Sequence, residues 1–205
     1  MTNEDPAQII VTPPTSGPSA DGLAKAASAA TKGRGPAPVH LWNPPYCGDL
    51  DIRIARDGLW YYLGTPIGRA PLVRLFSNIL KREGDRYFLV TPVEKVGITV
   101  DDAPLFAIDF EAEGAGPDQI LRLFTKTEDE VTVNADHALR ILRDPATGEP
   151  SPYVHVRAGL EARIDRKTFY RLVDLGAHEM RDGARWFGLW SSGVFFPIIP
   201  SAELS

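Results

Sequence analysis

The sequence predicts an α+β protein of two small domains related by duplication, with a helix in each unit. Apolar residues alternate on both sides of Asp57-Gly58, which is the pattern of a β-hairpin. Apolar residues with helical spacing follow from Pro71 to Leu80. The same order of hairpin, helix and strands returns about 100 residues later. Duplication explains this recurrence, although two generic units that resemble each other by chance would give the same pattern.

The composition is that of an ordinary soluble protein. Of the 205 residues, 43% are hydrophobic and 24% are charged, so a core can form without support from a metal or a disulfide. The single cysteine, Cys47, excludes an intramolecular disulfide and fits a reducing compartment. No apolar run reaches the length of a signal peptide or a membrane span. We therefore expect a cytoplasmic protein that does not insert into a membrane.

The net charge of −5 is concentrated in the middle of the chain. Residues 99–136 carry ten acidic and two basic side chains, whereas the other segments are close to neutral. Proteins that bind nucleic acids usually carry a basic stripe, so we expect no nucleic-acid polymer as a partner. The acidic segment is most simply a solvated face.

Residues 1–40 are predicted to be a flexible tail rich in proline, glycine and alanine. The first 38 residues contain six prolines and no aromatic residue, so they cannot bury enough apolar surface to offset the entropy lost on ordering. A short helix over residues 21–30 fits the spacing of the apolar residues, but alanine offers it little surface for docking. Order is expected to begin at Val39–Pro45.

The N-terminal α+β domain is predicted over residues 41–103. Its hairpin turns at Asp57-Gly58, because this dipeptide supplies the positive φ angles of a two-residue turn. Pro71 suits the first turn of the helix, and the basic residues before Gly84 are expected to close that helix. Two strands follow, at residues 87–92 and 95–100.

The C-terminal α+β domain is predicted over residues 104–205. Asp165 can cap its helix, because an aspartate side chain accepts hydrogen bonds from the free N–H groups of the first turn. Asp182-Gly183 then turns the chain into a strongly apolar β region. Alternating segments before the helix predict a mostly antiparallel, strongly bent sheet. These strands are expected at residues 105–111, 119–126, 129–133 and 138–143.

Several motifs resemble the bacterial family called domain of unknown function 1285 (DUF1285). They include Trp42-x-Pro-x-x-Cys, Arg56-Asp-Gly-Leu-Trp-Tyr-Tyr-Leu-Gly, Pro152-Tyr-Val-His-Val-Arg and Trp190-Ser-Ser-Gly-Val-Phe-Phe-Pro. The resemblance covers about residues 41–200. It implies two duplicated α/β domains, the second loosely like a pleckstrin-homology (PH) barrel. It also implies a nucleotide-like ligand between the domains and a role in signalling, and it supplies no catalytic residues.

The usual enzyme signatures are absent from the sequence. The chain has no phosphate-binding loop of the Gly-x-x-x-x-Gly-Lys type, no Gly-x-Gly-x-x-Gly turn and no Gly-x-Ser-x-Gly elbow. Its four histidines are widely spaced and display no zinc-binding pattern. No catalytic residue, metal ligand or cofactor is therefore assigned.

Arginines within the matching motifs are the candidate ligand-binding residues. Arg69 precedes a helix start, where backbone N–H groups also favour anions. Arg157 and Arg163 flank the corresponding turn of the second unit. If duplication places both turns at a shared interface, Arg69 and Arg163 are expected to face each other there and to clamp a phosphate or a carboxylate. A tryptophan ring can stack on a nucleobase, and a lysine can add a point charge. The predicted ligand site comprises Arg69, Arg157, Arg163, Lys95, Trp60 and Trp190. The alternative is that these side chains form salt bridges between the domains and packing contacts.

Three functions remain open at this point. The leading hypothesis is a module that senses a small anionic, nucleotide-like molecule at the domain interface, with a use in signal transduction. The second is a protein-interaction module whose barrel-like C-terminal domain binds a protein partner along a sheet edge. The third is a metal-dependent hydrolase that uses Asp49, Asp51 or Asp57.

Overall fold

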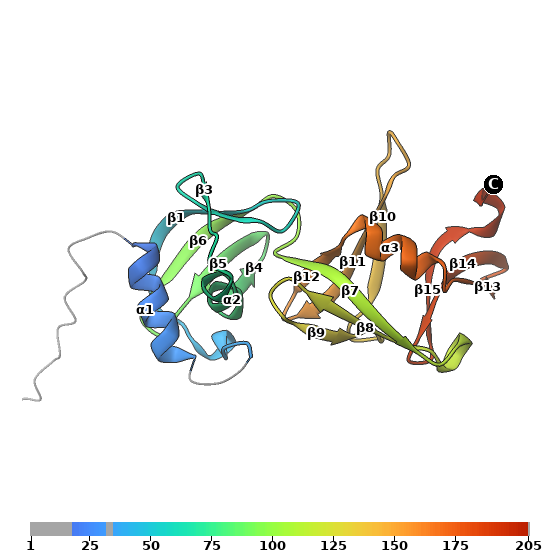
Figure 1. The fold of residues 1–205 in the computed structure, drawn as a ribbon, viewed down its shortest axis with the longest axis horizontal. Helices are drawn as coiled ribbons and strands as arrows, with labels where there is room; N and C mark the ends of the chain where they lie inside the picture. Colours follow the sequence, from blue (N-terminus) through green and yellow to red (C-terminus); the bar gives the residue numbers. More distant parts are fainter. Residues whose placement is uncertain (1–17, 32–34, 205) are drawn as a thin grey trace, which may run out of the picture.

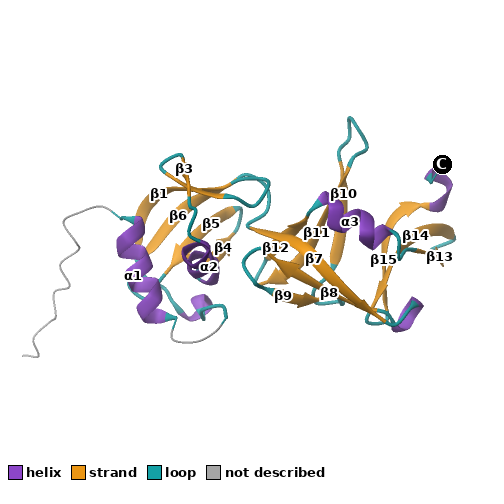
Figure 2. Cartoon of the chain, in the orientation of Figure 1, coloured by secondary structure: helices purple, strands orange, loops and turns teal. Residues whose placement is uncertain are grey.

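The computed structural model describes residues 18–31 and 35–204, which form two α+β domains lying side by side (Figure 1). Strands dominate both domains, and each domain carries helices on its sheets (Figure 2). The predicted fold class is therefore confirmed. None of the helices in these ranges has the length and apolar character that crossing a membrane requires.

The N-terminal domain is built on one six-stranded sheet with the strand order β3-β2-β1-β6-β5-β4. Strands β1 and β6 run parallel, and the other neighbours in this sheet are antiparallel. The strands are β1 (Tyr46–Ile54), β2 (Trp60–Tyr62), β3 (Thr65–Pro66), β4 (Leu80–Glu83), β5 (Arg86–Val90) and β6 (Lys95–Val100).

The hairpin between β1 and β2 forms at the predicted place with a longer turn. Ile54 pairs with Trp60, and the N–H of Gly58 donates to the carbonyl of Ala55 at 2.8 Å. Gly58 then takes the left-handed conformation, with φ of 76°. The four-residue turn 55–58 therefore ends in the left-handed Gly58, and the loop between Ala55 and Leu59 has three residues instead of the two that we expected.

Helix α2 (Ala70–Asn78) lies on this sheet and ends earlier than predicted. Proline suits its first turn because it has no N–H group that would need a partner there, and Phe76 is fully buried. The chain leaves the helix after Asn78, and residues 80–83 form strand β4, which pairs with β5. Pairing with a neighbouring strand, which periodicity alone does not reveal, ends the helix one turn early.

Helix α1 (Ala20–Ala30) corrects the prediction of a tail over residues 1–40. Ser19 caps it, because its Oγ accepts the N–H of Gly22 at 3.2 Å. Leu23 and Ala27 are 1% and 0% exposed in the core, and α1 packs against α2. Small alanines let the two helices approach closely, so one leucine suffices as an anchor. Residues 1–17 and 32–34 of the predicted tail lie outside the described residues.

The C-terminal domain contains a bent six-stranded sheet, a half-barrel with the strand order β10-β11-β12-β7-β8-β9. Its neighbours are antiparallel except for the parallel pair β7 and β12. The strands are β7 (Leu105–Glu113), β8 (Ile120–Thr125), β9 (Glu130–Thr132), β10 (Leu139–Arg143), β11 (Pro150–Arg157) and β12 (Leu160–Ile164).

Helix α3 (Arg166–Val173) and a second, three-stranded sheet complete this domain. The strands β13 (Ala177–Arg181), β14 (Ala184–Ser191) and β15 (Val194–Pro200) form an antiparallel meander. The buried Ser191 joins the two sheets, because its hydroxyl accepts the N–H of Leu121 and donates to the carbonyl of Val133. The short 3-10 helices are Val39–Leu41, Gly116–Asp118 and Ser201–Glu203.

The same order of hairpin, helix and three-stranded meander occurs in both domains. It comprises β1, β2, α2 and β4–β6 in the first domain and β11, β12, α3 and β13–β15 in the second. The domains differ in how the hairpin is completed. The meander of the first domain pairs with its own hairpin through β1 and β6. In the second domain β10 pairs with β11, the strand that corresponds to β1, and the second meander forms a separate sheet.

One ion pair on the half-barrel gives a pH-dependent prediction. Arg140 on β10 reaches across β11 and donates to both carboxylate oxygens of Glu161 on β12, at 2.6 Å each. The guanidinium also lies 4.5 Å from the ring centre of Tyr153. The hydrogen bonds from Arg140 hold the pKa of Glu161 below its ordinary value of 4.5.

We expect Glu161→Gln to lower the free energy of unfolding by about 1 kcal/mol at pH 7, because this charge-assisted pair is partly open to solvent. A pKa that folding lowers gives stability above the unfolded value of 4.5, and that stability disappears as the pH falls through the folded value. Urea unfolding at pH 7 and pH 3 measures the difference, with the exposed Glu130→Gln as the control. An equal deficit at both pH values would contradict the prediction.

Candidate functional site at the domain junction

A hollow of about 330 Å³ lies where the hairpin turn of the first domain meets α3 and β12 of the second. Its volume lies at the lower end of the range for small-molecule sites. Both charged and aromatic side chains line it. The lining residues are Arg56, Asp57, Phe106, Glu149, Pro150, Pro152, Arg163, Ile164, Asp165, Arg166, Phe169 and Tyr170.

The first domain contributes the turn that carries Arg56 and Asp57. A Cβ atom at Gly58 would lie 2.5 Å from the Cβ of Phe106, so only glycine lets the turn approach β7 this closely. Lys126 donates to the carbonyl of Asp57 at 2.7 Å and lies 4.6 Å from the ring centre of Phe106. These contacts fix the turn against the second domain and leave the Arg56 side chain 67% exposed.

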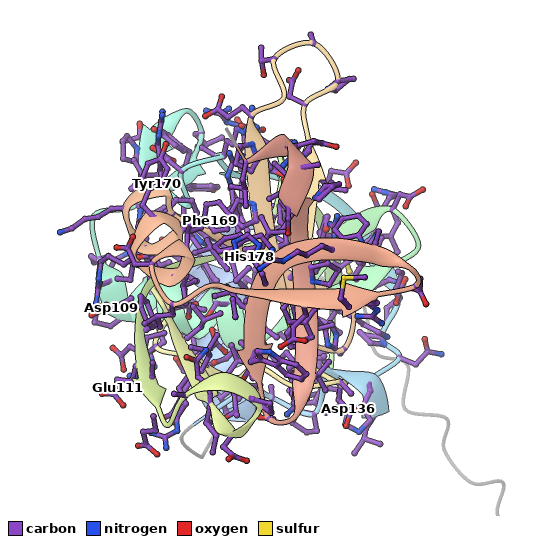
Figure 3. All side chains as sticks on the ribbon, turned by 90° about the vertical axis from the view of Figure 1, so that its right-hand side faces the viewer. Asp109, Glu111, Asp136, Phe169, Tyr170 and His178 are labelled. Atoms are coloured by element: carbon purple, nitrogen blue, oxygen red, sulfur yellow. The ribbon has the colours of Figure 1, made fainter. Side chains whose placement is uncertain are left out.

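The second domain contributes the first turn of α3. Asp165 caps this helix, because its Oδ1 accepts the N–H of Thr168 at 2.7 Å, which confirms the predicted cap. Arg166 and Tyr170 lie one helical turn apart directly after this cap, and Nε of Arg166 donates to the Tyr170 hydroxyl at 3.1 Å. Figure 3 shows Tyr170 at the outside of the helix and Phe169 toward the interior. The exposed wall of the hollow therefore pairs a cation with an aromatic ring.

Arg163 on β12 forms the floor of the hollow and is the most enclosed of the three arginines. Its side chain is 19% exposed, and it pairs with Asp102 in the segment that joins the domains. The hydroxyl of Tyr153 donates to Asp102 at 2.7 Å. Burial, with the Asp102 carboxylate as a further cause, raises the pKa of Tyr153, so this hydroxyl stays a hydrogen-bond donor at neutral pH.

The structure separates the two arginines that were predicted to face each other. Arg163 lines the junction hollow, whereas Arg69, at the start of α2, lines a different hollow of about 230 Å³ beside α1. The two linings share no residue. The prediction of an Arg69–Arg163 clamp is therefore corrected: α1 covers the side of the first domain where Arg69 lies, and the helix was not counted as part of that domain.

Two further predicted ligand contacts, Arg157 and Lys95, form ion pairs with carboxylates of the chain itself. Arg157 lies at the junction, but it pairs with Asp129 and donates to the carbonyl of Ser77 at 2.8 Å. Lys95 pairs with Glu83 at 2.9 Å within the first sheet. Both residues form salt bridges, as the alternative held, but each of these bridges lies within one domain; the hydrogen bond from Arg157 to Ser77 crosses the junction.

Neither predicted tryptophan lies at the hollow. Trp60 is 3% exposed, and its ring stacks on Phe76 in the core of the first domain. Trp190 lies on β14 in the separate three-stranded sheet, where its Nε1 donates to Glu179 at 3.2 Å. Both rings pack within single domains, so the expectation that they meet a ligand at the domain interface does not hold for this hollow.

Of the residues that line the hollow, the sequence reasoning named only Arg163 as a ligand contact; those it missed include Arg56, Phe106, Arg166 and Tyr170. A signal for two of them was present, since Arg166 and Tyr170 have helical i, i+4 spacing directly after the predicted Asp165 cap. Arg56 stands before the predicted turn, and nothing in its local pattern shows that the turn reaches the second domain.

The aspartates of the hydrolase hypothesis do not form a metal site. Asp49 accepts hydrogen bonds from Tyr46 and Arg86, and Asp57 accepts the N–H of Leu59. Within residues 18–31 and 35–204, no three His, Cys, Asp or Glu side chains are grouped so that they could hold a metal ion. The geometry of these side chains gives the hydrolase hypothesis no support.

Comparison with known proteins gives one family. Residues 37–103 match a family model described as "Domain of unknown function (DUF1285), N-terminal domain", and residues 104–198 match "Protein of unknown function (DUF1285), C-terminal domain". The crystal structure of a DUF1285 family protein from Silicibacter pomeroyi is 63% identical, with a TM-score of 0.81, over 91% of this chain and 99% of that one. One from Shewanella baltica is 32% identical, with a TM-score of 0.48, over 61% and 91%. None of the curated proteins matches this chain.

Proposed function

We propose, for a chain that belongs to the DUF1285 family, that it binds a small anionic, nucleotide-like molecule in the junction hollow and senses it. The observation that supports this proposal is the convergence of three arginines from two domains on one hollow that aromatic rings also line. Guanidiniums bind phosphates and carboxylates, and aromatic faces stack on nucleobases. Arg56, Arg163 and Arg166 are the proposed anion contacts, and Tyr170 is the proposed stacking surface.

The position of the hollow supports a sensing role. Arg56 belongs to the first domain, and Arg166 belongs to the second, so a ligand that contacts both stabilises one arrangement of the domains. A use in signal transduction and a cytoplasmic location are part of the proposal. The single cysteine supports that location, because it cannot form an intramolecular disulfide.

Thermal unfolding with a panel of ligands tests the proposal. ATP, GTP and AMP are compared with adenosine, which has no phosphate, and with pyrophosphate, which has no ring. A ligand at 100 times its Kd adds about 2.7 kcal/mol to the free energy of unfolding. We expect the nucleotides to stabilise the protein more than either comparison compound. If no compound raises Tm at millimolar concentration, the proposal is wrong, and recognition of a protein partner along the free edge strand β13 becomes the favoured function.

Arg166→Ala is expected to weaken binding of the best nucleotide in the panel about 10- to 100-fold, because a hydrogen bond to a charged group is lost. Arg166 is 74% exposed, so its removal should leave the fold unchanged. Lys167→Ala is the matched control, since it removes one positive charge from the same helix outside the hollow. Isothermal titration calorimetry measures both variants. Equal losses in the two variants would show a general charge effect and would contradict a specific role for Arg166.

A further inference from the structure

One carboxylate contacts two of the three proposed anion contacts. Asp102 Oδ2 accepts a hydrogen bond from Nη1 of Arg163 and lies 3.5 Å from Nε of Arg56. Its Oδ1 accepts a hydrogen bond from the hydroxyl group of Tyr153. Asp102 itself lies between β6 and β7, in the segment that connects the domains. The same side chain therefore links the hairpin turn of the first domain to β11 and β12 of the second.

The contact between Asp102 and Arg163 is shielded from water. The two side chains are 18% and 19% exposed, so their attraction is screened less than that of a surface pair. An anion that enters the hollow meets an Arg163 whose charge is already balanced. The negative charge of Asp102 also repels an anion that approaches Arg163.

We propose that Asp102 is a built-in competitor of the ligand, and that the exchange of partners transmits binding to the domain junction. The anionic group of the ligand and the Asp102 carboxylate compete for Arg56 and Arg163. When the ligand takes these arginines, the connecting segment loses its link to the hairpin turn. This inference rests on the proposed function and adds to it the regulation of the same site.

Thermodynamic linkage turns the inference into an affinity change. If the ligand weakens the contacts of Asp102, then removing the Asp102 charge must strengthen ligand binding by the same factor. The test measures ATP and pyrophosphate affinity by calorimetry for wild type, Asp102→Asn and Asp101→Asn. Asp101 is a neighbour in the same segment, and its carboxylate pairs with Arg53 at 2.7 Å, away from the hollow. Both variants change the net charge equally.

We expect Asp102→Asn to bind ATP at least tenfold more tightly than wild type and Asp101→Asn to stay within twofold of it. Equal binding by wild type and Asp102→Asn would overturn the competitor role and leave the site itself intact. Weaker binding by Asp102→Asn would also overturn it, because Asp102 would then be a positioning residue for Arg163. Absence of ATP and pyrophosphate binding in all three proteins would contradict the proposed function and the inference together.

Hydrogen exchange on the wild-type protein tests the inference without any substitution, and so covers the case in which Asp102→Asn does not fold. Saturating ATP should speed amide exchange at the connecting residues 101–103, because the ligand releases Asp102. Slower or unchanged exchange there, at an ATP concentration shown by calorimetry to saturate the site, would overturn the inference.

Discussion

Replacement of Trp60 with alanine is expected to lower the free energy of unfolding by about 3–5 kcal/mol, the cost of removing a large buried aromatic side chain. Trp60 is 3% exposed at the start of β2. Its ring lies 6.3 Å from that of Phe76, between ring centres, with 28° between the planes, so it couples the sheet to α2. The loss combines the apolar area returned to water with the cavity that remains.

Urea unfolding followed by circular dichroism measures this loss. Leu59→Ala, at the exposed neighbouring residue, is the matched control and should change stability by less than about 0.5 kcal/mol. Nucleotide affinity of the folded variant should equal that of wild type, because Trp60 does not line the junction hollow. A stability loss below about 1 kcal/mol together with a loss of affinity would restore the stacking role that the sequence suggested.

Leu23→Ala is expected to cost about 2–5 kcal/mol, although Leu23 lies in a segment whose composition predicts a tail. Its side chain is 1% exposed, and it anchors α1 among the buried residues of the first domain. Alanines make up most of the remaining buried face of this helix, so no other large side chain can compensate.

The control for Leu23 is Lys25→Ala, an exposed residue of the same helix whose replacement should be nearly neutral. Urea unfolding of both variants gives the comparison, and protease cleavage near α1 gives a second readout. If the midpoint of urea unfolding is the same for Leu23→Ala and for wild type, α1 does not contribute to the stability of the first domain.

Local patterns in the sequence were sufficient to predict most of the elements. Alternation around Asp57-Gly58 gave the first hairpin, and the spacing after Asp165 gave a capped helix. These features depend on residues within about ten positions of one another, so a short stretch of sequence is enough to predict them. The end of α2 was missed because it depends on β4 pairing with β5.

The candidate site was harder to predict, because it depends on which charges meet across the junction. Arg157 and Arg163 stand near the same turn in the sequence, yet one meets Asp129 and the other meets Asp102. Residue type does not show whether an arginine faces a carboxylate of its own chain or a hollow. Arg163 was predicted and lines the hollow, whereas Arg56 reaches it only because the glycine turn packs on Phe106.

The parallel pairing of β1 with β6 has a consequence for synthesis of the chain on the ribosome. The two strands begin at Tyr46 and Lys95, so the central pair of the first sheet cannot form until nearly half of the 205 residues have been translated. Until then the nascent hairpin offers an unpaired edge along β1, which is a site for erroneous association between chains. A chaperone that binds short extended segments would protect the polypeptide during this interval.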